Sequence, residues 1–170
     1  MGEELAELIS FFHKKNILVI VDDCYRKIIY GEGKYPPPLS LVPAAQEHVA
    51  VVSSLSKTYA MTGWRIGYTI ASEALAAAMT KVQEHSTSNP CSISQKAAVE
   101  ALAGDQGAVR AMVEEYRLRR DYFAGRVDDI GHIAYALPDG AFYFFADFSH
   151  YIRRKKFQDD NQLAMDILEK

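Results

Sequence analysis

The spacing of apolar residues predicts an opening helix followed by a buried strand. Within residues 3–15, apolar side chains recur at helical intervals, at Leu5, Leu8, Ile9 and Phe12. Asn16 comes next, a residue type that often ends a helix, and residues 17–21 then form a wholly apolar run. A run that is apolar on both faces is typical of a parallel strand covered by helices.

Two further apolar runs predict that this strand has neighbours in a sheet. Residues 49–53 follow a proline-rich loop at 36–38, and residues 66–71 follow a polar segment. Both runs are short and apolar throughout, so the same reasoning predicts buried strands. We therefore expect three buried strands in the first half of the chain.

Helical periodicity dominates residues 73–129. The predicted helices span residues 73–84, 92–102 and 106–129, with breaks at Asn89-Pro90 and Gly104. Alternation typical of strands resumes at 132–136 and 141–147, and residues 160–169 predict one more helix. Strands that alternate with helices favour an α/β fold, in which ligands bind at the carboxyl ends of the strands.

Composition and charge narrow the classes of function. The 170 residues include 19 basic and 22 acidic residues, for a net charge of −3, so neither a nucleic acid nor an anionic membrane is expected as a partner. Apolar residues make up 49% and are spread along the chain rather than gathered into a membrane span. Cys24 and Cys91 form no disulfide framework, and with no leader pattern recognisable we expect a cytoplasmic protein. The five histidines lack a second ligand at metal spacing, so no metal is expected.

Polar clusters flank the predicted strands. They are Asp22-Asp23-Cys24-Tyr25, Ser54-Leu55-Ser56-Lys57 and Gly63-Trp64-Arg65-Ile66-Gly67-Tyr68. A lysine that forms a Schiff base must be partly neutral, so burial or a nearby positive charge has to lower its free pKa of about 10.4. Lys57 lies just beyond a strand and eight positions before Arg65, which makes it a candidate. Most loop lysines are simply solvated, so the assignment of Lys57 as a Schiff-base lysine depends on the residues around it as well.

The motif around Lys57 has a family resemblance. Residues 54–68, SLSKTYAMTGWRIGY, closely resemble the cofactor-lysine motif of the class I and II aminotransferases, which are fold-type I pyridoxal-phosphate enzymes. Asp22-x-x-Tyr25 resembles that family's second cofactor motif, and residues 95–102 and 138–143 are similar to weaker family patterns. The resemblance implies part of that fold's large domain, a mostly parallel sheet with flanking helices, and the start of a smaller α+β C-terminal domain.

The resemblance assigns roles to the residues nearest the cofactor ring. Lys57 would hold pyridoxal 5'-phosphate as a Schiff base and then move a proton as the catalytic base. Asp22 would keep the pyridine nitrogen protonated, and Tyr25 would donate its hydroxyl to the phenolic oxygen. Asp22 is preferred to Asp23 because it lies three positions before Tyr25. The alternatives are a turn-forming aspartate and an amphipathic tyrosine at the protein surface.

A second group of residues would bind the cofactor's phosphate. By resemblance these are Ser54, Ser56 and Arg65, since two hydroxyls and a forked guanidinium supply directed donors to a dianion. The alternative is that the serines form turns and the arginine forms a surface ion pair. Gly63 and Gly67 are expected to allow close backbone packing around Arg65. The basic run at 117–120 is flanked by acidic residues and is expected to be a solvated helix face.

The resemblance also implies an activity and partners. It implies an enzyme that moves an amino group from an amino acid to a 2-oxo acid, of the aspartate or aromatic aminotransferase kind, and a homodimer. A carbon–sulfur β-lyase shares these motifs and would release pyruvate and ammonia without a 2-oxo acid acceptor. A non-enzymatic regulatory module that keeps the fold is a third possibility, although it predicts an attached DNA-binding domain and the sequence shows no helix-turn-helix.

The length is short for such an enzyme. Family members are commonly about twice this size, as expected for two-domain proteins. Their asparagine-containing cofactor segment would precede Glu3, and their carboxylate-binding arginine would follow Lys170. We therefore expect a fragment that is inactive alone. Its expected parts are residues 1–105 in the large cofactor-binding domain, 106–130 as an interdomain helix, and 131–170 as the beginning of the small domain.

Overall fold

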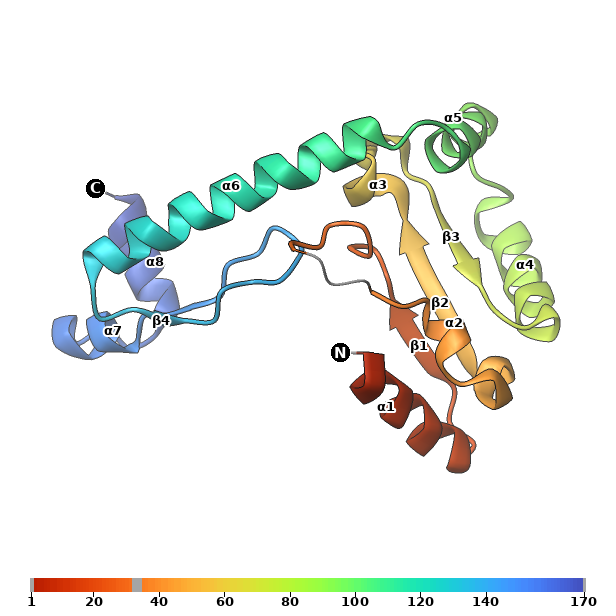
Figure 1. The fold of residues 1–170 in the computed structure, drawn as a ribbon, viewed down its shortest axis with the longest axis horizontal. Coiled ribbons are helices and arrows are strands. Elements are labelled where there is room, and N and C mark those ends of the chain that lie inside the picture. The colour runs from red at the N-terminus through yellow and green to blue at the C-terminus, as the bar shows by residue number, and fades with distance from the viewer. Residues whose placement is uncertain (1, 32–34, 170) are drawn as a thin grey trace.

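The computed structural model describes residues 2–31 and 35–169, which form a mixed α/β lobe joined by a long helix to a C-terminal arm (Figure 1). We call residues 2–31 and 35–105 the sheet lobe and residues 131–169 the C-terminal arm. The lobe contains strands β1 (Val19–Asp22), β2 (Val49–Ser54) and β3 (Gly67–Ile70), and the arm contains β4 (Ala134–Tyr135) and β5 (Ala146–Asp147). The described α-helices are α1 (Gly2–Lys14), α2 (Pro38–Leu41), α3 (Leu55–Thr58), α4 (Glu73–Thr87), α5 (Ser92–Ala103), α6 (Gly107–Ile130), α7 (Ser149–Lys155) and α8 (Asp160–Leu168).

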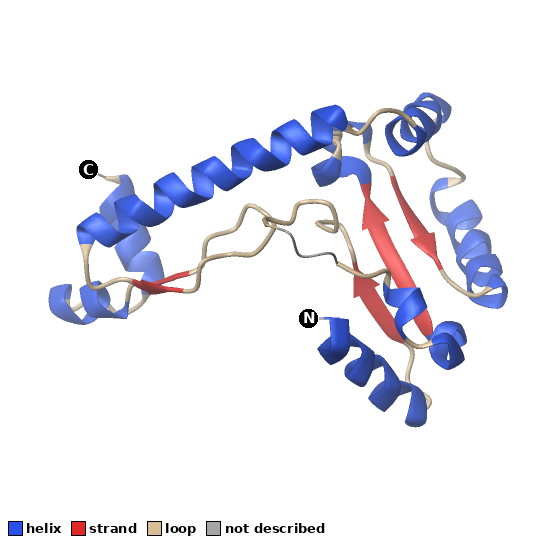
Figure 2. Ribbon diagram, in the orientation of Figure 1, coloured by secondary structure: helices blue, strands red, loops and turns tan. Residues whose placement is uncertain are grey.

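The sheet of the lobe has the order β1-β2-β3 (Figure 2). β1 and β2 are parallel, and Asp22 at the end of β1 lies opposite Val52. β2 and β3 are antiparallel, and Ser54 at the end of β2 lies opposite Gly67 at the start of β3. The ends of β1 and β2 therefore meet the start of β3 at one edge of the sheet. The α/β prediction is confirmed, and β3 is the strand of this sheet that runs antiparallel to its neighbour.

One face of the sheet is packed and the other is open. Helices α1 and α2 and the 3-10 helix η1 (Pro43–His48) cover the packed face, where Ile9, Val49 and Val51 are at most 3% exposed. On the other face, Ile20 is 68% exposed. The expectation of strands buried on both faces is therefore correct for most of β2 and wrong for β1 and β3, because the described elements cover one side of those strands.

A loop of the C-terminal arm returns to the sheet lobe. After α6 the chain runs outward, and residues 136–145 turn back toward the loop that follows β1 (Figure 1). The Ala141 amide donates to the Ile28 carbonyl at 2.8 Å, and the Tyr30 amide donates to the Asp139 carbonyl at 2.8 Å. A β-carbon on Gly140 would lie 2.7 Å from the Ile28 carbonyl oxygen, so this close approach requires glycine. We call the contact of residues 28–30 with residues 139–141 the seam.

Several elements differ from those predicted. The proline-rich loop contains α2 and η1, both of which begin with proline, because proline lacks an amide hydrogen that the first helical turn does not use. Helix α7 was not predicted. The two strands expected in the arm pair over only two residues each, at Ala134–Tyr135 and Ala146–Asp147, and the rest of those segments is irregular.

The helices give no sign of a membrane span. Within residues 2–31 and 35–169, no helix is both long enough and apolar enough to cross a bilayer.

Candidate active site

Lys57 lies on a single helical turn that a hydrophobic anchor holds in place. Helix α3 begins directly after β2, and the Ser54 hydroxyl accepts a hydrogen bond from the Ser56 amide at 3.0 Å, which caps the turn. Leu55 is 1% exposed and packs with Met61 and Ala98. The turn that carries Lys57 is thus fixed at its first residue by both a cap and a buried side chain.

The two aspartates at the end of β1 have opposite environments. Asp22 is exposed, and its Oδ1 accepts from the Cys24 amide at 3.1 Å. Hydrogen bonds from the Cys24 thiol and then from its amide lower the pKa of Asp22, so this carboxylate is ionised at neutral pH. Asp23 is 4% exposed, and burial raises its pKa, although Arg26 at 3.7 Å opposes that effect. Asp22 is therefore exposed to solvent, while the side chain of Asp23 is buried.

Hydrogen bonds connect the end of β1 to the region around Lys57. The Asp23 amide donates to the Val52 carbonyl at 2.8 Å, and the Thr58 hydroxyl contacts the Cys24 carbonyl at 3.5 Å. Burial raises the pKa of the Cys24 thiol to about 11, and the positive charge of Lys57 acts on it in the opposite direction. The structure thus brings Asp22 and Lys57 to the same edge of the sheet.

Tyr25 is contacted by the arm as well as by the lobe. Its hydroxyl lies 2.7 Å from the hydroxyl of Tyr143, and its ring centre lies 5.3 Å from that of Phe142. Lys57 Nζ lies 5.7 Å from the centre of the same Phe142 ring. Burial and the hydrogen bond with Tyr143 raise the pKa of Tyr25 to about 12. Sequence reasoning identified residues 138–143 only as a weak family pattern and missed this contact.

The residues expected to bind phosphate lie along the same edge. The Thr62 hydroxyl donates to the Ser56 carbonyl at 3.2 Å, and Arg65 Nη1 donates to the Thr62 carbonyl at 2.9 Å. Arg65 is exposed and has a left-handed backbone with φ 50°. Its guanidinium keeps four further N–H donors, and the Ser54 hydroxyl, which acts as an acceptor in the cap, keeps its own proton to donate.

The two glycines of this motif differ. A β-carbon on Gly67 would lie 2.6 Å from the Ser53 carbonyl oxygen, so the expected close packing is confirmed there. The corresponding position on Gly63 has no neighbouring atom within 4 Å, so the expectation is wrong for Gly63. Only Gly67 is required for the approach of β3 to β2.

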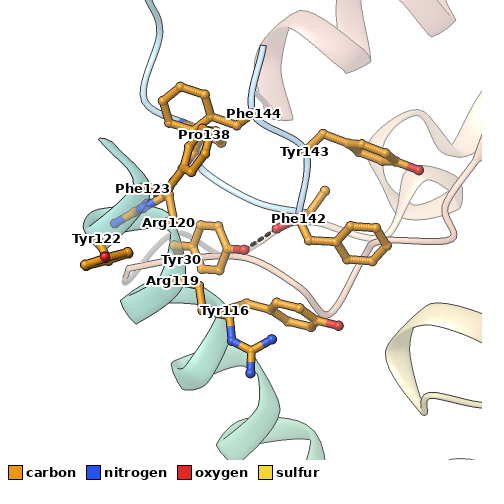
Figure 3. A pocket seen from close by; sticks show the side chains of 11 residues that line it. Tyr30, Tyr116, Arg119, Arg120, Tyr122, Phe123, Pro138, Phe142, Tyr143 and Phe144 are labelled. Carbon is orange, nitrogen blue, oxygen red and sulfur yellow. Dashed lines mark hydrogen bonds between the residues drawn. The ribbon is translucent and has the colours of Figure 1, made fainter. Parts of the chain in front are cut away.

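Two cavities lie near these residues. A cavity of about 240 Å³ is lined by Asp22, Asp23, Tyr25, Arg26, Ile28, Ile29, Tyr35, Gly140 and Ala141. A larger cavity of about 530 Å³ lies between α6 and the returning loop and is walled mainly by aromatic rings (Figure 3). The larger cavity shares Tyr143 with the site, but its lining excludes Asp22 and Lys57. The smaller cavity includes Asp22 and Tyr25, whereas Lys57 lines neither of these two cavities.

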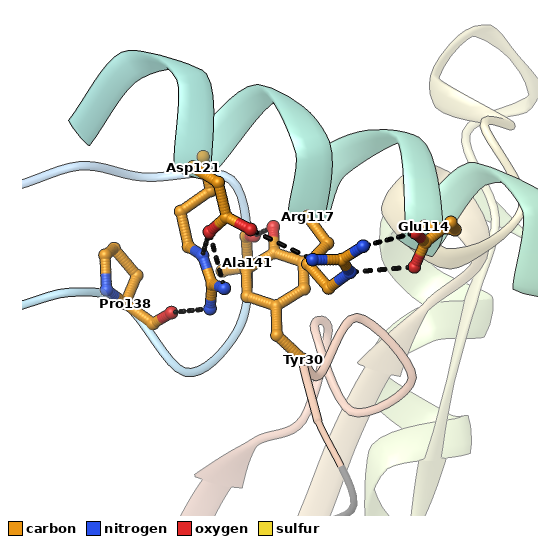
Figure 4. Close-up of polar contacts among 7 residues, drawn as sticks. Tyr30, Glu114, Arg117, Asp121, Pro138 and Ala141 are labelled. Atoms are coloured by element: carbon orange, nitrogen blue, oxygen red, sulfur yellow. Dashed lines mark hydrogen bonds and ion pairs between the residues drawn. The ribbon is translucent and has the colours of Figure 1, made fainter. Parts of the chain in front are cut away.

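Arg120 links α6 to the returning loop through contacts with Tyr30 and Pro138, which Figure 4 labels. Its guanidinium stacks 4.7 Å from the centre of the Tyr30 ring, and Nη1 donates to the Pro138 carbonyl at 2.8 Å. The Tyr30 hydroxyl in turn donates to the Ala141 carbonyl. Asp121 pairs with Arg120 at 2.7 Å.

The rest of the basic run is also paired. Arg117 contacts Glu114 and Asp121, and Arg119 contacts Glu115 at 2.7 Å. These pairs lie within one helix, so the expectation of a solvated helix face is confirmed for Arg117 and Arg119. It is wrong for Arg120, whose side chain is 15% exposed and packs against the returning loop. Within residues 2–31 and 35–169, no group of three or more His, Cys, Asp or Glu side chains is arranged to hold a metal ion.

The sequence as a whole matches one known family. The family profile described as aminotransferase class I and II matches residues 2–170. The chain belongs to the class I and II aminotransferases. This aminotransferase chain is 40% identical over 144 residues to a probable aspartate/prephenate aminotransferase of Rickettsia prowazekii, covering 84% of the chain and 36% of that protein. It is 39% identical over 166 residues to the aspartate/prephenate aminotransferase of Nitrosomonas europaea, covering 97% of the chain and 42% of that protein.

Solved aminotransferase structures share the fold. The aspartate aminotransferase of Rhizobium meliloti superimposes with a TM-score of 0.82 at 35% identity, over 86% of this chain and 37% of that one. The aromatic aminotransferase of Pyrococcus horikoshii gives a TM-score of 0.79 at 32% identity, over 85% and 38%. The predicted fold type is thereby confirmed. The aminotransferase chain spans about two-fifths of the length of these relatives.

Proposed function

We propose that this chain is part of a pyridoxal-phosphate-dependent aminotransferase that transfers an amino group from an amino acid to a 2-oxo acid. The observation that carries the proposal is the convergence of Asp22, Tyr25 and Lys57 at one edge of the sheet, where β1 and β2 end. The names of the relatives favour substrates of the aspartate or aromatic class.

The side chains at this edge fit the chemical groups of the cofactor. An exposed, ionised carboxylate at Asp22 suits a protonated ring nitrogen, and the hydroxyl of Tyr25 suits a phenolic oxygen. The exposed guanidinium of Arg65, with the hydroxyls of Ser54 and Ser56, suits a phosphate. When bound, the cofactor supplies an electron sink for the carbanion formed at the substrate's Cα.

Each residue then has a defined task. Asp22 keeps a proton on the ring nitrogen, because the hydrogen bonds from Cys24 keep its own carboxylate ionised. Tyr25 donates its hydroxyl proton to the phenolic oxygen and so orients the ring. Lys57 Nζ would hold the cofactor and would accept and return the proton at the substrate's Cα.

The proposal extends to the organisation of the whole protein. We propose that residues 1–105 belong to the cofactor domain, that 106–130 connect the domains, and that 131–170 begin the second domain. The long helix α6 supports this division. We also propose that two copies form a homodimer in the cytoplasm. The exposed apolar side chains on β1 and on α5, such as Ile20 and Ile93, offer surface for such packing.

Covalent labelling tests the position of the lysine. The chain is incubated with pyridoxal phosphate, reduced with borohydride, digested and mapped by mass spectrometry. We expect the label on Lys57, its loss in Lys57→Ala, and its retention in the control Lys81→Ala, which changes a lysine on α4. A label on another lysine in the unmodified chain would contradict the site assignment.

Turnover assays test the reaction. We expect the 170-residue chain alone to give no turnover of amino acids with 2-oxoglutarate, because it spans about two-fifths of its relatives. A longer chain that includes these residues should form the corresponding 2-oxo acid and glutamate. Release of pyruvate and ammonia from a cysteine conjugate without a 2-oxo acid would instead favour a carbon–sulfur β-lyase.

A further inference from the structure

Two tyrosine hydroxyls from distant parts of the sequence meet at the candidate site. Tyr25 and Tyr143 are 118 positions apart, their hydroxyl oxygens lie 2.7 Å apart, and their rings meet edge to face with centres 5.5 Å apart. Tyr25 follows β1 in the sheet lobe, whereas Tyr143 lies on the loop that returns from the arm. None of the assigned tasks uses Tyr143.

The backbone and a neighbouring ring hold Tyr143 in this place. The seam fixes Gly140 and Ala141 against the backbone of residues 28–30. Phe142 then packs between Tyr25 at 5.3 Å and Tyr116 of α6 at 5.4 Å, measured between ring centres. Tyr143 is 62% exposed, so burial of its own ring does not determine where it lies. The position of its hydroxyl is set by the backbone contacts of the seam and by the hydrogen bond with Tyr25.

The number of protons decides which hydroxyl donates. Each phenol has one proton, so in a hydroxyl pair one partner donates and the other accepts. If Tyr25 donates its proton to the phenolic oxygen of the cofactor, the Tyr25 oxygen can only accept from Tyr143. The hydrogen bonds then run in one direction, from Tyr143 to Tyr25 and from Tyr25 to the cofactor.

We propose that Tyr143 is a positioning residue that orients the Tyr25 hydroxyl and strengthens its hydrogen bond to the phenolic oxygen of the cofactor. The inference rests on the proposed function of Tyr25. A hydroxyl that accepts a hydrogen bond becomes a stronger donor, because consecutive hydrogen bonds polarise one another. Burial raises the pKa of Tyr25, so the phenol keeps its proton at neutral pH and has that proton to donate.

The hydroxyl pair is tested first without cofactor. Tyrosines labelled with carbon-13 at Cζ are titrated by NMR between pH 9 and 12.5 in the unmodified chain and in Tyr143→Phe. Without cofactor the Tyr25 hydroxyl has no phenolic oxygen to donate to and donates to Tyr143 instead, which favours the protonated phenol. We therefore expect Tyr25 to titrate at about pH 12 in the unmodified chain and at lower pH in the variant, which lacks this acceptor. The control Tyr122→Phe removes a hydroxyl from a 72% exposed ring on α6 and should leave Tyr25 unchanged. An unchanged Tyr25 titration in Tyr143→Phe would overturn the proposal.

The role toward the cofactor is tested by absorbance. In chain carrying the cofactor on Lys57, absorbance against pH follows the proton shared between Lys57 Nζ and the phenolic oxygen. A weaker hydrogen bond from Tyr25 leaves that oxygen more basic, so Tyr143→Phe should lower the proton's dissociation constant by about threefold. Tyr25→Phe should lower it further, and Tyr122→Phe should not change it.

The outcomes separate this inference from the proposed function. If the unmodified chain forms no adduct at Lys57, the proposed function fails and the role of Tyr143 fails with it. If the adduct forms but Tyr143→Phe leaves the pH midpoint unchanged, only the role of Tyr143 is overturned. Urea unfolding of Tyr143→Phe controls for structure, since a residue with a merely structural role would change stability without moving the midpoint.

Discussion

The sheet lobe and the C-terminal arm hold their functional side chains in different ways. In the lobe, Lys57 follows Leu55, which is 1% exposed and packed in a hydrophobic cluster. In the arm, Tyr143 is followed closely by Phe145, which is 93% exposed, and the nearest strands pair over two residues. The lobe therefore positions its residues by packing. The arm positions Tyr143 through the backbone contacts of the seam.

This difference assigns separate tasks to the two regions. In the proposed site, the lobe contributes the charged side chains, namely Asp22, Lys57 and Arg65. The arm provides aromatic groups, Phe142 and Tyr143, that reach the site through a contact distant in sequence. Variants that damage one region and spare the other test the comparison.

The largest effect is expected from Leu55→Ala. Removing a fully buried side chain next to Lys57 leaves a cavity and should reduce the free energy of unfolding by about 2–5 kcal/mol. Leu137→Ala is the matched control in the arm, where the side chain is 49% exposed, and it should change stability by at most about 0.5 kcal/mol. Urea unfolding measures both. Equal losses in the two variants would show that the regions are packed alike.

Gly140→Ala should disturb the seam. The new β-carbon would lie 2.7 Å from the Ile28 carbonyl oxygen, so the loop must move at a cost of about 1–3 kcal/mol. Hydrogen exchange should increase at the amides of Tyr30 and Ala141, while the amides of β2 stay protected. Gly125→Ala on α6 has open space around the new methyl group and should instead stabilise that helix by about 1 kcal/mol. Unchanged exchange at the seam in Gly140→Ala would contradict this account.

Arg120→Lys should weaken the same attachment from the side of α6. Lysine keeps the charge but loses the planar group that stacks on Tyr30 and bonds the Pro138 carbonyl (Figure 4). We expect a loss of about 1 kcal/mol and faster exchange at the seam. Arg119→Lys changes an exposed ion pair with Glu115 and should have almost no effect. Equal effects of the two substitutions would show that the stacking contributes nothing.

The smallest effect is expected from alkaline pH. The pKa of Tyr25 is raised to about 12 in the folded chain, so its contribution to stability is complete below about pH 10 and is lost as the pH rises toward 12. The contribution should be less than about 1 kcal/mol, because solvent screens this incompletely buried pair. Urea unfolding of the unmodified chain and of Tyr25→Phe should show a smaller loss in the variant over this range. Parallel pH profiles would contradict the assigned cause.

The sequence predicted the elements whose signals are local. The apolar runs located β1, β2 and β3, and periodicity located α1, α4, α5, α6 and α8, with ends correct to within a few residues. The motif around Lys57 placed its residues directly after a strand, as the structure has them. These features depend on neighbours in the sequence, which is why the pattern was sufficient.

The features that the sequence did not predict depend on distant neighbours. The contact of Tyr25 with Tyr143 spans 118 positions, and no local pattern encodes it. One face of β1 is exposed because the described helices cover only its other face. The direction of β3 depends on how the chain connects it to β2. The choice of Asp22 over Asp23 was made from spacing to Tyr25, and the burial of Asp23 supports it.

Helix α6 and the seam are two separate connections between the sheet lobe and the C-terminal arm. Its 24 residues give a rigid rod about 36 Å long, so tilting its first turn by about 5° would carry the far end through about 3 Å. The seam holds the returning loop against the sheet lobe, so the arm is attached to the lobe both through α6 and through this loop. A tilt of the helix would shift Gly140 and, three residues further along the chain, the hydroxyl of Tyr143. A movement of the arm would therefore reach the candidate site as a displacement of one hydroxyl.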